Sequence, residues 1–271
     1  MSSPPPSRAP ASPAALPCAK PLVAVTWVGD DGLKTTAAAL ARDTALPLVV
    51  ARDEGFDLLL ALTGKRLELQ EVRNPRLGPV YVDYSGLDLR PYSRNLSRRQ
   101  PLPRAFGKKV HTVLDATAGY GQDALLLALM GFRVTAIERS MVIAELTRDG
   151  LRRFEADTGI SLVNRLRLVS GDARAILAAL PQRPDAVYLD PMFPPKRKKS
   201  AAVNKEMRLL RELVGDDPDA PELLEIGRRA ARERVIVKRP YDAPPLAPNP
   251  DMSFPGKLVR YDVYLARPSH D

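Results

Sequence analysis

From Val110 onward the sequence alternates short apolar segments with amphipathic ones, and this alternation limits the possible folds more than any other feature. Segments rich in β-branched residues predict strands, and each is followed by a segment with helical periodicity. Repeated βα units fold as a parallel sheet covered by helices on both faces. We therefore predict an α/β fold with a mostly parallel, doubly wound sheet over residues 110–271. The predicted strands are 110–115, 133–138, 165–169, 186–190, 234–239 and 258–265, and the predicted helices are 123–130, 142–154, 173–180 and 221–231, with a further short helix that contains Lys205 and Arg208.

The chain before Val110 divides into three segments of different composition. Residues 1–20 are rich in Pro, Ala and Ser, which predicts a disordered tail. Residues 21–87 are predicted to form a small N-terminal α/β subdomain, and residues 88–109 a basic connecting segment. Within the subdomain we expect a short apolar run at 21–28, a helix at 35–42, and strands at 58–62, 67–72 and 80–82.

The composition excludes several classes of protein. Cys18 is the only cysteine, so no intrachain disulfide can form, and with only His111 and His270 beside it we expect no metal site. No apolar run approaches the roughly 20 residues that span a bilayer. The N-terminus lacks the basic start and apolar centre of a secretory signal. We therefore expect a cytoplasmic, monomeric protein that does not bind membranes.

Positive charge dominates the sequence, with 41 Lys and Arg against 32 Asp and Glu and a formal net charge of +9. This balance suits a polyanion such as nucleic acid, although a basic soluble enzyme would have the same composition. The basic clusters are candidates for RNA phosphate binding, and the alternative interpretation is a solvated linker or surface. For Lys238 and Arg239, which end the fifth strand of the large predicted sheet, the alternative is an ion pair with Asp190 or Glu206. The candidate RNA-binding residues are Arg94, Arg98, Arg99, Lys196, Arg197, Lys198, Lys199, Lys238 and Arg239.

Acidic residues and glycines follow the first three strands of the predicted sheet. Gly119 and Gly121 allow a tight turn at a helix N-terminus, and Asp115 precedes that turn. An acid there repels a pyrophosphate but suits a cationic ligand that carries an amino group and a sulfonium. Glu138, about 20 residues further on, can accept both hydroxyls of a ribose. Asp172 and Ala173 end the third strand and suit the edge of an adenine.

These strand ends together predict S-adenosylmethionine as the cofactor, with NAD as the weaker competitor. The alternative interpretation is that individual acids cap helices, and Asp172 and Asp123 are the two best placed to do so.

The fourth strand ends in the segment VYLDPMFPP at residues 187–195, which is the most specific signal in the chain. A planar exocyclic amine is a poor nucleophile because its lone pair is delocalised into the ring. An enzyme that methylates such an amine must therefore hold it with hydrogen-bond acceptors that direct the lone pair toward the methyl donor. The carboxylate of Asp190 and the carbonyl of Pro191 can accept its two N–H groups, and Phe193 can stack on the base. We predict that these three residues form the catalytic centre, the alternative being a proline-rich turn after a buried strand.

Several motifs in combination resemble those of the bacterial 16S rRNA (guanine(1516)-N(2))-methyltransferases. They are DATAGYGQD at 115–123, ER at 138–139, YLDPMFP at 188–194, KEMR at 205–208, VKRP at 237–240 and APPL at 243–246. The resemblance covers residues 80–266 and implies a Rossmann-like class I methyltransferase fold that uses S-adenosylmethionine. The cofactor positions that it implies are Gln122, Asp123, Glu138, Arg139, Asp172, Ala173 and Asp190. The predicted cofactor contacts at the end of the first strand are Asp115, Ala116, Gly119 and Gly121. The family usually has Arg at the position of Gln122 and a Gly-rich basic segment in place of residues 94–101.

The resemblance implies methylation of the exocyclic N2 amine of a guanine, with small-subunit rRNA or the 30S subunit as partner. No covalent intermediate is expected, because Cys18 lies in the tail and cannot serve as the nucleophile for carbon methylation of a pyrimidine. The alternatives are another amine, such as adenine N6 or a protein glutamine amide, a Rossmann-fold RNA-binding protein without chemistry, and an NAD-linked oxidoreductase.

Overall fold

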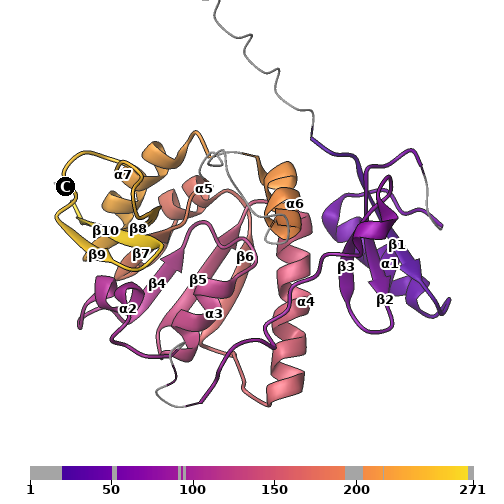
Figure 1. Cartoon of the computed structure of the whole chain (residues 1–271), viewed down its shortest axis with the longest axis horizontal. Helices are drawn as coiled ribbons and strands as arrows, with labels where there is room; N and C mark the ends of the chain where they lie inside the picture. The colour runs from indigo at the N-terminus through magenta and orange to yellow at the C-terminus, as the bar shows by residue number, and fades with distance from the viewer. Residues whose placement is uncertain are drawn as a thin grey trace, which may run out of the picture.

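The computed structural model describes residues 20–50, 54–90, 93, 96–192, 204–215 and 217–267. These residues form two sheets, a large one and a small N-terminal one (Figure 1). The large sheet has strands β4 (Thr112–Asp115), β5 (Arg133–Glu138), β6 (Leu166–Ser170), β7 (Ala186–Leu189), β8 (Arg234–Pro240), β9 (Met252–Pro255) and β10 (Val259–Leu265). Their order is β6-β5-β4-β7-β8-β10-β9; β10 pairs antiparallel with both β8 and β9, and the other neighbouring strands pair parallel. The prediction of a mostly parallel α/β sheet is confirmed.

Strand order changes direction in the middle of this sheet. The chain runs from β4 outward to β5 and β6, then returns to place β7 and β8 on the other side of β4. Asp115 at the end of β4 is therefore in register with Ala136 of β5 and with Tyr188 of β7. In such sheets ligands bind outside the carboxyl ends of the strands at this switch point.

Helices cover both faces of the large sheet because alternate strand residues point to opposite sides. Val113, Ala136 and Tyr188 pack with Leu127 of α3 (Gln122–Leu129) on one face. Leu114, Ile137 and Val187 pack on the other face with α5 (Ala173–Ala178) and α7 (Ala220–Ala230). α4 (Met141–Thr158) lies beside α3 and reaches toward the N-terminal sheet. The buried strands thus fix the carboxyl ends rigidly.

Two elements of the large sheet layer are absent from the sequence-based prediction. The helix α2 (Pro101–Phe106) lies within the predicted connecting segment, and its Leu102, Ala105 and Phe106 are buried. The Phe106 ring centroid is 5.3 Å from that of Phe132 and 6.1 Å from that of Tyr188. Strand β9 is short and ends at Pro255, so its sequence has no clear strand signal, and it forms only by pairing with β10.

The N-terminal sheet contains β1 (Val23–Val28), β2 (Leu58–Thr63) and β3 (Leu67–Glu71), with α1 (Leu33–Thr44) and the 3-10 turn η1 (Pro75–Leu77). β1 pairs parallel to β2, and β2 pairs antiparallel to β3. The predicted strand at 80–82 is wrong, because Val80 makes only an isolated bridge to Leu69. The chain instead leaves the sheet and packs on α4, where a Cβ on Gly150 would lie 2.7 Å from Cγ1 of Val82.

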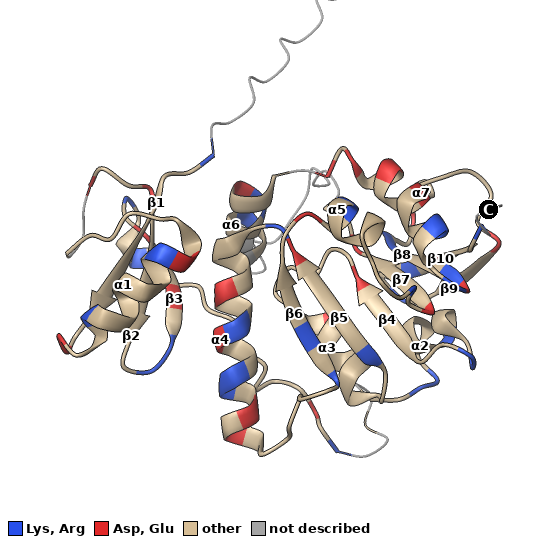
Figure 2. Ribbon diagram, turned by 180° about the vertical axis from the view of Figure 1, so that it is seen from behind, with Lys and Arg blue, Asp and Glu red and all other residues tan. Residues whose placement is uncertain are grey.

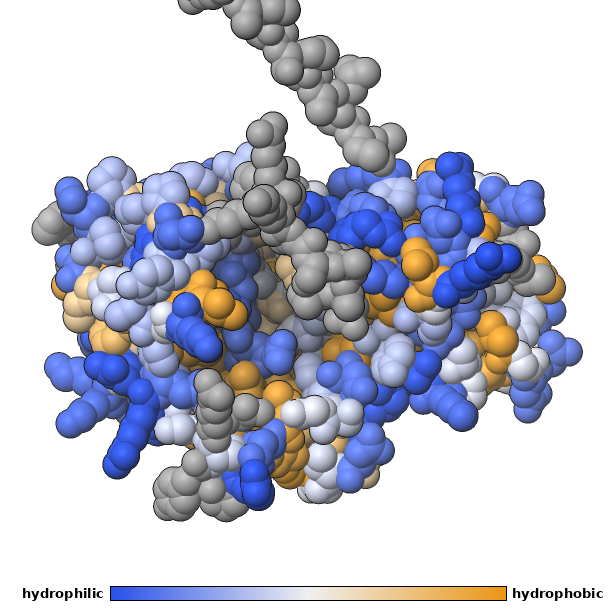
Figure 3. Space-filling model, viewed as in Figure 1, coloured by the Kyte–Doolittle hydropathy of each residue, from blue (hydrophilic) through white to orange (hydrophobic). Residues whose placement is uncertain are grey.

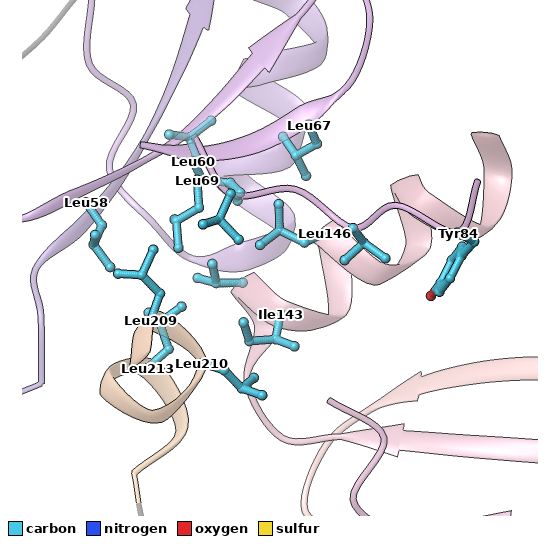
Figure 4. Packing of buried hydrophobic residues seen from close by; sticks show 14 of the residues in the cluster. Leu58, Leu60, Leu67, Leu69, Tyr84, Ile143, Leu146, Leu209, Leu210 and Leu213 are labelled. Atoms are coloured by element: carbon cyan, nitrogen blue, oxygen red, sulfur yellow. The ribbon is translucent and has the colours of Figure 1, made fainter. Parts of the chain in front are cut away.

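The two sheets share one hydrophobic cluster, shown in Figure 4. Leu60 and Leu69 of the small sheet meet Ile143 of α4 and Leu209 and Leu213 of α6 (Asn204–Val214). The domain boundaries drawn from the sequence therefore stay a prediction. On the face seen in Figure 3, hydrophobic side chains form small patches separated by hydrophilic ones. Within the described ranges, no helix has the length and apolar character needed to cross a membrane.

Candidate functional site

A cavity of about 660 Å³ opens at the carboxyl ends of β4, β5, β6 and β7. It lies at the point where the strand order changes direction, as expected for a ligand site in this class of sheet. Of the predicted cofactor residues, only Gly121 does not line it. The others are Asp115, Ala116, Gly119, Gln122, Asp123, Glu138, Arg139, Asp172, Ala173 and Asp190.

The loop between β4 and α3 is held on three sides. The Gly119 amide donates a hydrogen bond to Oε2 of Glu138 (2.8 Å), and the Thr147 hydroxyl donates to the Gly119 carbonyl (3.0 Å). The Tyr84 hydroxyl donates to the Tyr120 carbonyl (2.7 Å), which ties the loop to the segment after the small sheet. Gly121 has a φ of +70°, and a Cβ there would lie 2.8 Å from Cγ2 of Thr147. Gly121 therefore shapes the loop from behind the cavity wall.

Glu138 is buried at the end of β5, with a fixed carboxylate. Its second oxygen, Oε1, accepts a hydrogen bond from the Ser140 amide (2.7 Å), while Oε2 is held by Gly119. Burial raises the pKa of Glu138, although both backbone hydrogen bonds favour the charged form. Each carboxylate oxygen keeps a further lone pair for a ligand hydroxyl. The geometry suits recognition of a diol from the cavity side.

Asp115 lies on the cavity wall at the end of β4 and is only 1% exposed. Its Oδ1 accepts a hydrogen bond from the Thr117 amide (3.0 Å). Burial, with a smaller contribution from the Asp123 and Asp190 charges, raises the pKa of Asp115 to about 8. A cation bound in the cavity would restore the charged form, whereas a pyrophosphate would meet repulsion. The cavity thus favours a cationic ligand.

Asp190 follows β7 and is oriented by two contacts. Its amide donates to the Thr117 hydroxyl (2.6 Å), and its Oδ2 lies 2.9 Å from Nζ of Lys238. Its Oδ1 accepts no hydrogen bond from the described part of the chain. Burial, with help from the nearby Asp123 charge, raises the pKa of Asp190 despite Lys238. One carboxylate oxygen is therefore anchored and the other is available to a ligand.

Lys238 bridges Asp190 to a second carboxylate. Its Nζ lies 2.8 Å from Oδ2 of Asp123, which also accepts the Tyr188 hydroxyl (2.6 Å). Burial opposes the charge on Lys238, but the two carboxylates raise the pKa of its ammonium group above the ordinary value. Lys238 is thus part of an ion-pair network inside the site, which is the alternative weighed for it in the sequence; its role as a charge that faces RNA stays a prediction.

Arg239 also differs from the expectation. It is 6% exposed, and its guanidinium donates through Nε to the Pro244 carbonyl (2.9 Å). Because this group is used to hold the chain after β8, Arg239 does not present its charge to RNA. Neighbouring residues of a strand face opposite sides of the sheet. Arg239 therefore faces the side opposite to Lys238 and stabilises the fold.

Asp172 and Arg139 line the cavity but are engaged with neighbouring protein groups. Asp172 is the N-cap of α5, accepting from the Arg174 amide (2.9 Å), and it also pairs with the Arg174 guanidinium. Arg139 forms an ion pair with Asp217 and donates to the Val214 carbonyl. The capping alternative thus holds for Asp172. It does not hold for Asp123, because Gly121 occupies the N-cap of α3.

Arg98, in the predicted basic connecting segment, does not lie beside this cavity. The Arg98 guanidinium lies 5.0 Å from the ring centroid of Phe132, which directly precedes β5 and so marks the amino end of the parallel strands. Arg98 therefore lies at the end of the sheet opposite the cavity, and its predicted role in RNA binding stays a prediction. Five further predicted RNA-binding residues and one catalytic residue lie outside the described residues. They are Arg94, Lys196, Arg197, Lys198, Lys199 and Phe193.

Sequence reasoning missed several groups that build the site. Thr117 anchors Asp190, and Asp217 accepts the Met192 amide (2.6 Å) from a position 25 residues away. The helix α6 supplies Met207 and Leu210 to the cavity wall. Thr117 carried a signal, since it follows a strand that ends in an acid, and Met207 lies in the motif KEMR at 205–208. In the part of the chain that the structure describes, no group of three or more His, Cys, Asp or Glu could hold a metal ion.

Comparisons with known proteins agree with this geometry. Residues 42–266 match the family described as "Putative SAM-dependent methyltransferase". The ribosomal RNA small subunit methyltransferase J of Coxiella burnetii is 44% identical over 235 residues, covering 85% of this chain and 92% of the relative. The protein of the same name from Thioalkalivibrio sulfidiphilus is 44% identical over 251 residues, with coverage of 90% and 97%.

A solved structure has a similar fold over most of the chain. The SAM-dependent methyltransferase from Neisseria gonorrhoeae superposes with a TM-score of 0.67 at 30% identity, covering 91% of this chain and 97% of the other. The fold and the sequence identity over most of the length thus agree. The chain therefore belongs to the ribosomal RNA small subunit methyltransferase J family of S-adenosylmethionine-dependent methyltransferases.

Proposed function

We propose that this protein transfers a methyl group from S-adenosylmethionine to the exocyclic N2 amine of a guanine in small-subunit ribosomal RNA. The observation that carries the proposal is the placement of Asp190. Its carboxylate follows the central strand β7, is anchored through one oxygen, and lies on the wall of the cavity that also holds Asp115 and Glu138. The names of the relatives support small-subunit rRNA as the substrate class.

The residues of the cavity fit the cofactor. Glu138 has a fixed, buried carboxylate for the ribose hydroxyls, and Asp115 has a carboxylate that gains from a nearby cation. Asp172 and Ala173 stand where the adenine edge would lie, and the β4–α3 loop supplies Gly119. When bound, the cofactor supplies an electrophilic methyl group on its sulfonium. We further propose that Gln122, Asp123 and Arg139 contribute to cofactor binding by shaping the cavity wall.

Asp190 and Pro191 orient the amine for attack. The Oδ1 of Asp190 and the Pro191 carbonyl each accept one N–H of the exocyclic amine, which turns the nitrogen lone pair toward the methyl donor. Lys238 holds Oδ2, so the carboxylate cannot rotate away from the amine. Asp190 need not remove a proton before transfer, because the methylated amine becomes acidic and loses its proton to solvent.

Base and phosphate contacts complete the proposal. Phe193 stacks on the guanine, and Lys196, Arg197, Lys198 and Lys199 contact phosphates beside it; all five lie outside the described residues. Arg94, Arg98 and Arg99 remain candidates for RNA binding. We propose a monomer that acts on rRNA or the 30S subunit in the cytoplasm.

The test is transfer of a labelled methyl group to ribosomal RNA from a strain that lacks this protein. Naked 16S rRNA and assembled small subunits are offered separately, and the modified nucleotide is mapped. We expect label on the N2 of one guanine with the wild-type protein, and transfer about 10²–10³-fold slower with Asp190→Asn. Label on adenine N6 or on protein would overturn the proposed substrate, and binding of NAD in place of S-adenosylhomocysteine would overturn the cofactor.

A further inference from the structure

A second hollow, of about 630 Å³, lies at the end of the large sheet opposite the first cavity, at the amino ends of strands β4, β5 and β6. Strand residues form its floor, among them Leu114, Thr135 and Leu166. α5, which packs on one face of the sheet, is only six residues long, and none of its residues lines the hollow. We call this hollow the rear groove, and Figure 2 shows basic residues at the lower ends of β5 and β6 that border it.

Three exposed arginines stand on one side of the sheet at this groove. Thr135 is in register with Arg167, so two residues earlier on each strand Arg133 lies beside Arg165. Residues two apart on a strand share a face, which places all three side chains on the side of the groove. Their charges therefore add over a short stretch of surface.

The charge of these arginines is not neutralised by the described part of the protein. Arg133, Arg165 and Arg167 have no side-chain hydrogen bond or ion pair there. No Asp or Glu is among the described residues that line the groove. Asp185 directly follows Pro184, a residue that lines the groove. Its carboxylate accepts hydrogen bonds from the amides of His111 and Thr112, and these bonds lower its pKa despite burial. The groove is thus a site of uncompensated positive charge.

We propose that the rear groove binds the phosphate backbone of the RNA substrate at a place separate from the methylation site. Guanidinium groups suit this role because their planar fork donates two hydrogen bonds to one phosphate. Arg98, above Phe132, continues the positive surface from Arg133 around the same edge. An extended series of cations fits a long polyanion better than a compact anion. This inference rests on the proposed function.

A structural explanation competes with this proposal. β6 is the edge strand of the large sheet, and charged side chains on edge strands prevent pairing with other chains. Arginine stems can also cover apolar floor residues such as Leu114, which lines the same groove. Under that explanation, removal of the charges changes solubility or stability but leaves RNA affinity unchanged.

The test compares two triple variants of equal charge. The first is Arg133→Ala, Arg165→Ala and Arg167→Ala. The matched control, Arg42→Ala, Lys65→Ala and Arg76→Ala, removes three exposed cations from the N-terminal part. Binding to full-length 16S rRNA from a strain lacking the protein is measured from 0.05 to about 0.5 M salt, and S-adenosylhomocysteine binding reports on the fold.

We expect the groove variant to lose about two units of the slope of log K against log salt, since each single-strand phosphate contact contributes roughly 0.7. At about 0.1 M salt this corresponds to roughly 100-fold weaker binding. The control variant should lose clearly less of both the slope and the affinity. S-adenosylhomocysteine affinity should be unchanged in both.

Two outcomes would overturn the inference. An unchanged slope in the groove variant, with or without self-association, would assign the arginines to protection of the sheet edge. An equal loss in both variants would show unspecific charge attraction. Either result leaves methylation by the wild-type protein standing, whereas failure of the wild-type protein to methylate or bind the rRNA would instead refute the proposed function.

Discussion

The substitution Lys238→Met removes the cation between two carboxylates and keeps a side chain of similar length. Nζ lies 2.8 Å from Asp123 and 2.9 Å from Asp190, and the three side chains are 23%, 21% and 38% exposed. Removing one partner of a fully buried pair costs about 3–5 kcal/mol because a charge is left uncompensated. Solvent relieves part of that cost here, so we expect the free energy of unfolding at pH 7 to fall by about 2 kcal/mol.

The pH dependence of this loss has a definite sign. In the wild-type protein Lys238 lowers the pKa of Asp123 below 3.8, although burial opposes this. The ionised carboxylate therefore stabilises the fold above that pH, and the contribution is lost as the pH falls through the lowered value. The variant lacks it, so the difference in stability should be largest near neutral pH and should shrink below about pH 4.

Catalysis gives an independent readout of the same substitution. Burial already raises the pKa of Asp190, and loss of the ammonium group raises it further. The acid limb of the kcat profile should therefore move to higher pH. Urea unfolding at pH 7 and pH 4 and methyl-transfer rates across pH measure both effects, with Lys65→Met on an exposed turn as the control. Wild-type stability at pH 7 together with an unmoved acid limb would refute the assigned role of Lys238.

Three further substitutions test the site. Asp190→Asn should lower kcat by about 10²–10³-fold while S-adenosylhomocysteine affinity stays within a few-fold, and wild-type turnover would remove Asp190 from the mechanism. Gly121→Ala places a Cβ 2.8 Å from Cγ2 of Thr147 at a φ of +70°, so thermal unfolding should report a loss of about 1–3 kcal/mol and cofactor titration a weaker complex. Tyr84→Phe removes the bond to the Tyr120 carbonyl and should cost about 1 kcal/mol in urea unfolding; a larger loss of cofactor affinity than of stability would show that the bond orders the loop.

Much of the large sheet could be predicted because its strands are buried on both faces and carry continuous apolar runs. The ends of those runs located Asp115, Glu138 and Asp190, since a buried strand must end where a polar side chain can reach the surface or a ligand. The short strand β9 and the helix α2 escaped prediction for the opposite reason. Each is too short for a periodic signal and depends on packing against β10 or Phe132.

The sequence by itself determined the class of fold, the carboxyl ends at which the site lies and the acids that mark it, because these depend on local hydrophobic patterns. Tertiary structure alone decided which of those acids are paired. Lys238 meets Asp123 across 115 residues, and this contact depends on β8 and α3 being brought together by the strand order. It also decided that Arg98 lies on the far edge and that Arg239 is buried, because the direction in which a charged side chain points is fixed by the packing around its strand or loop and not by the charge itself.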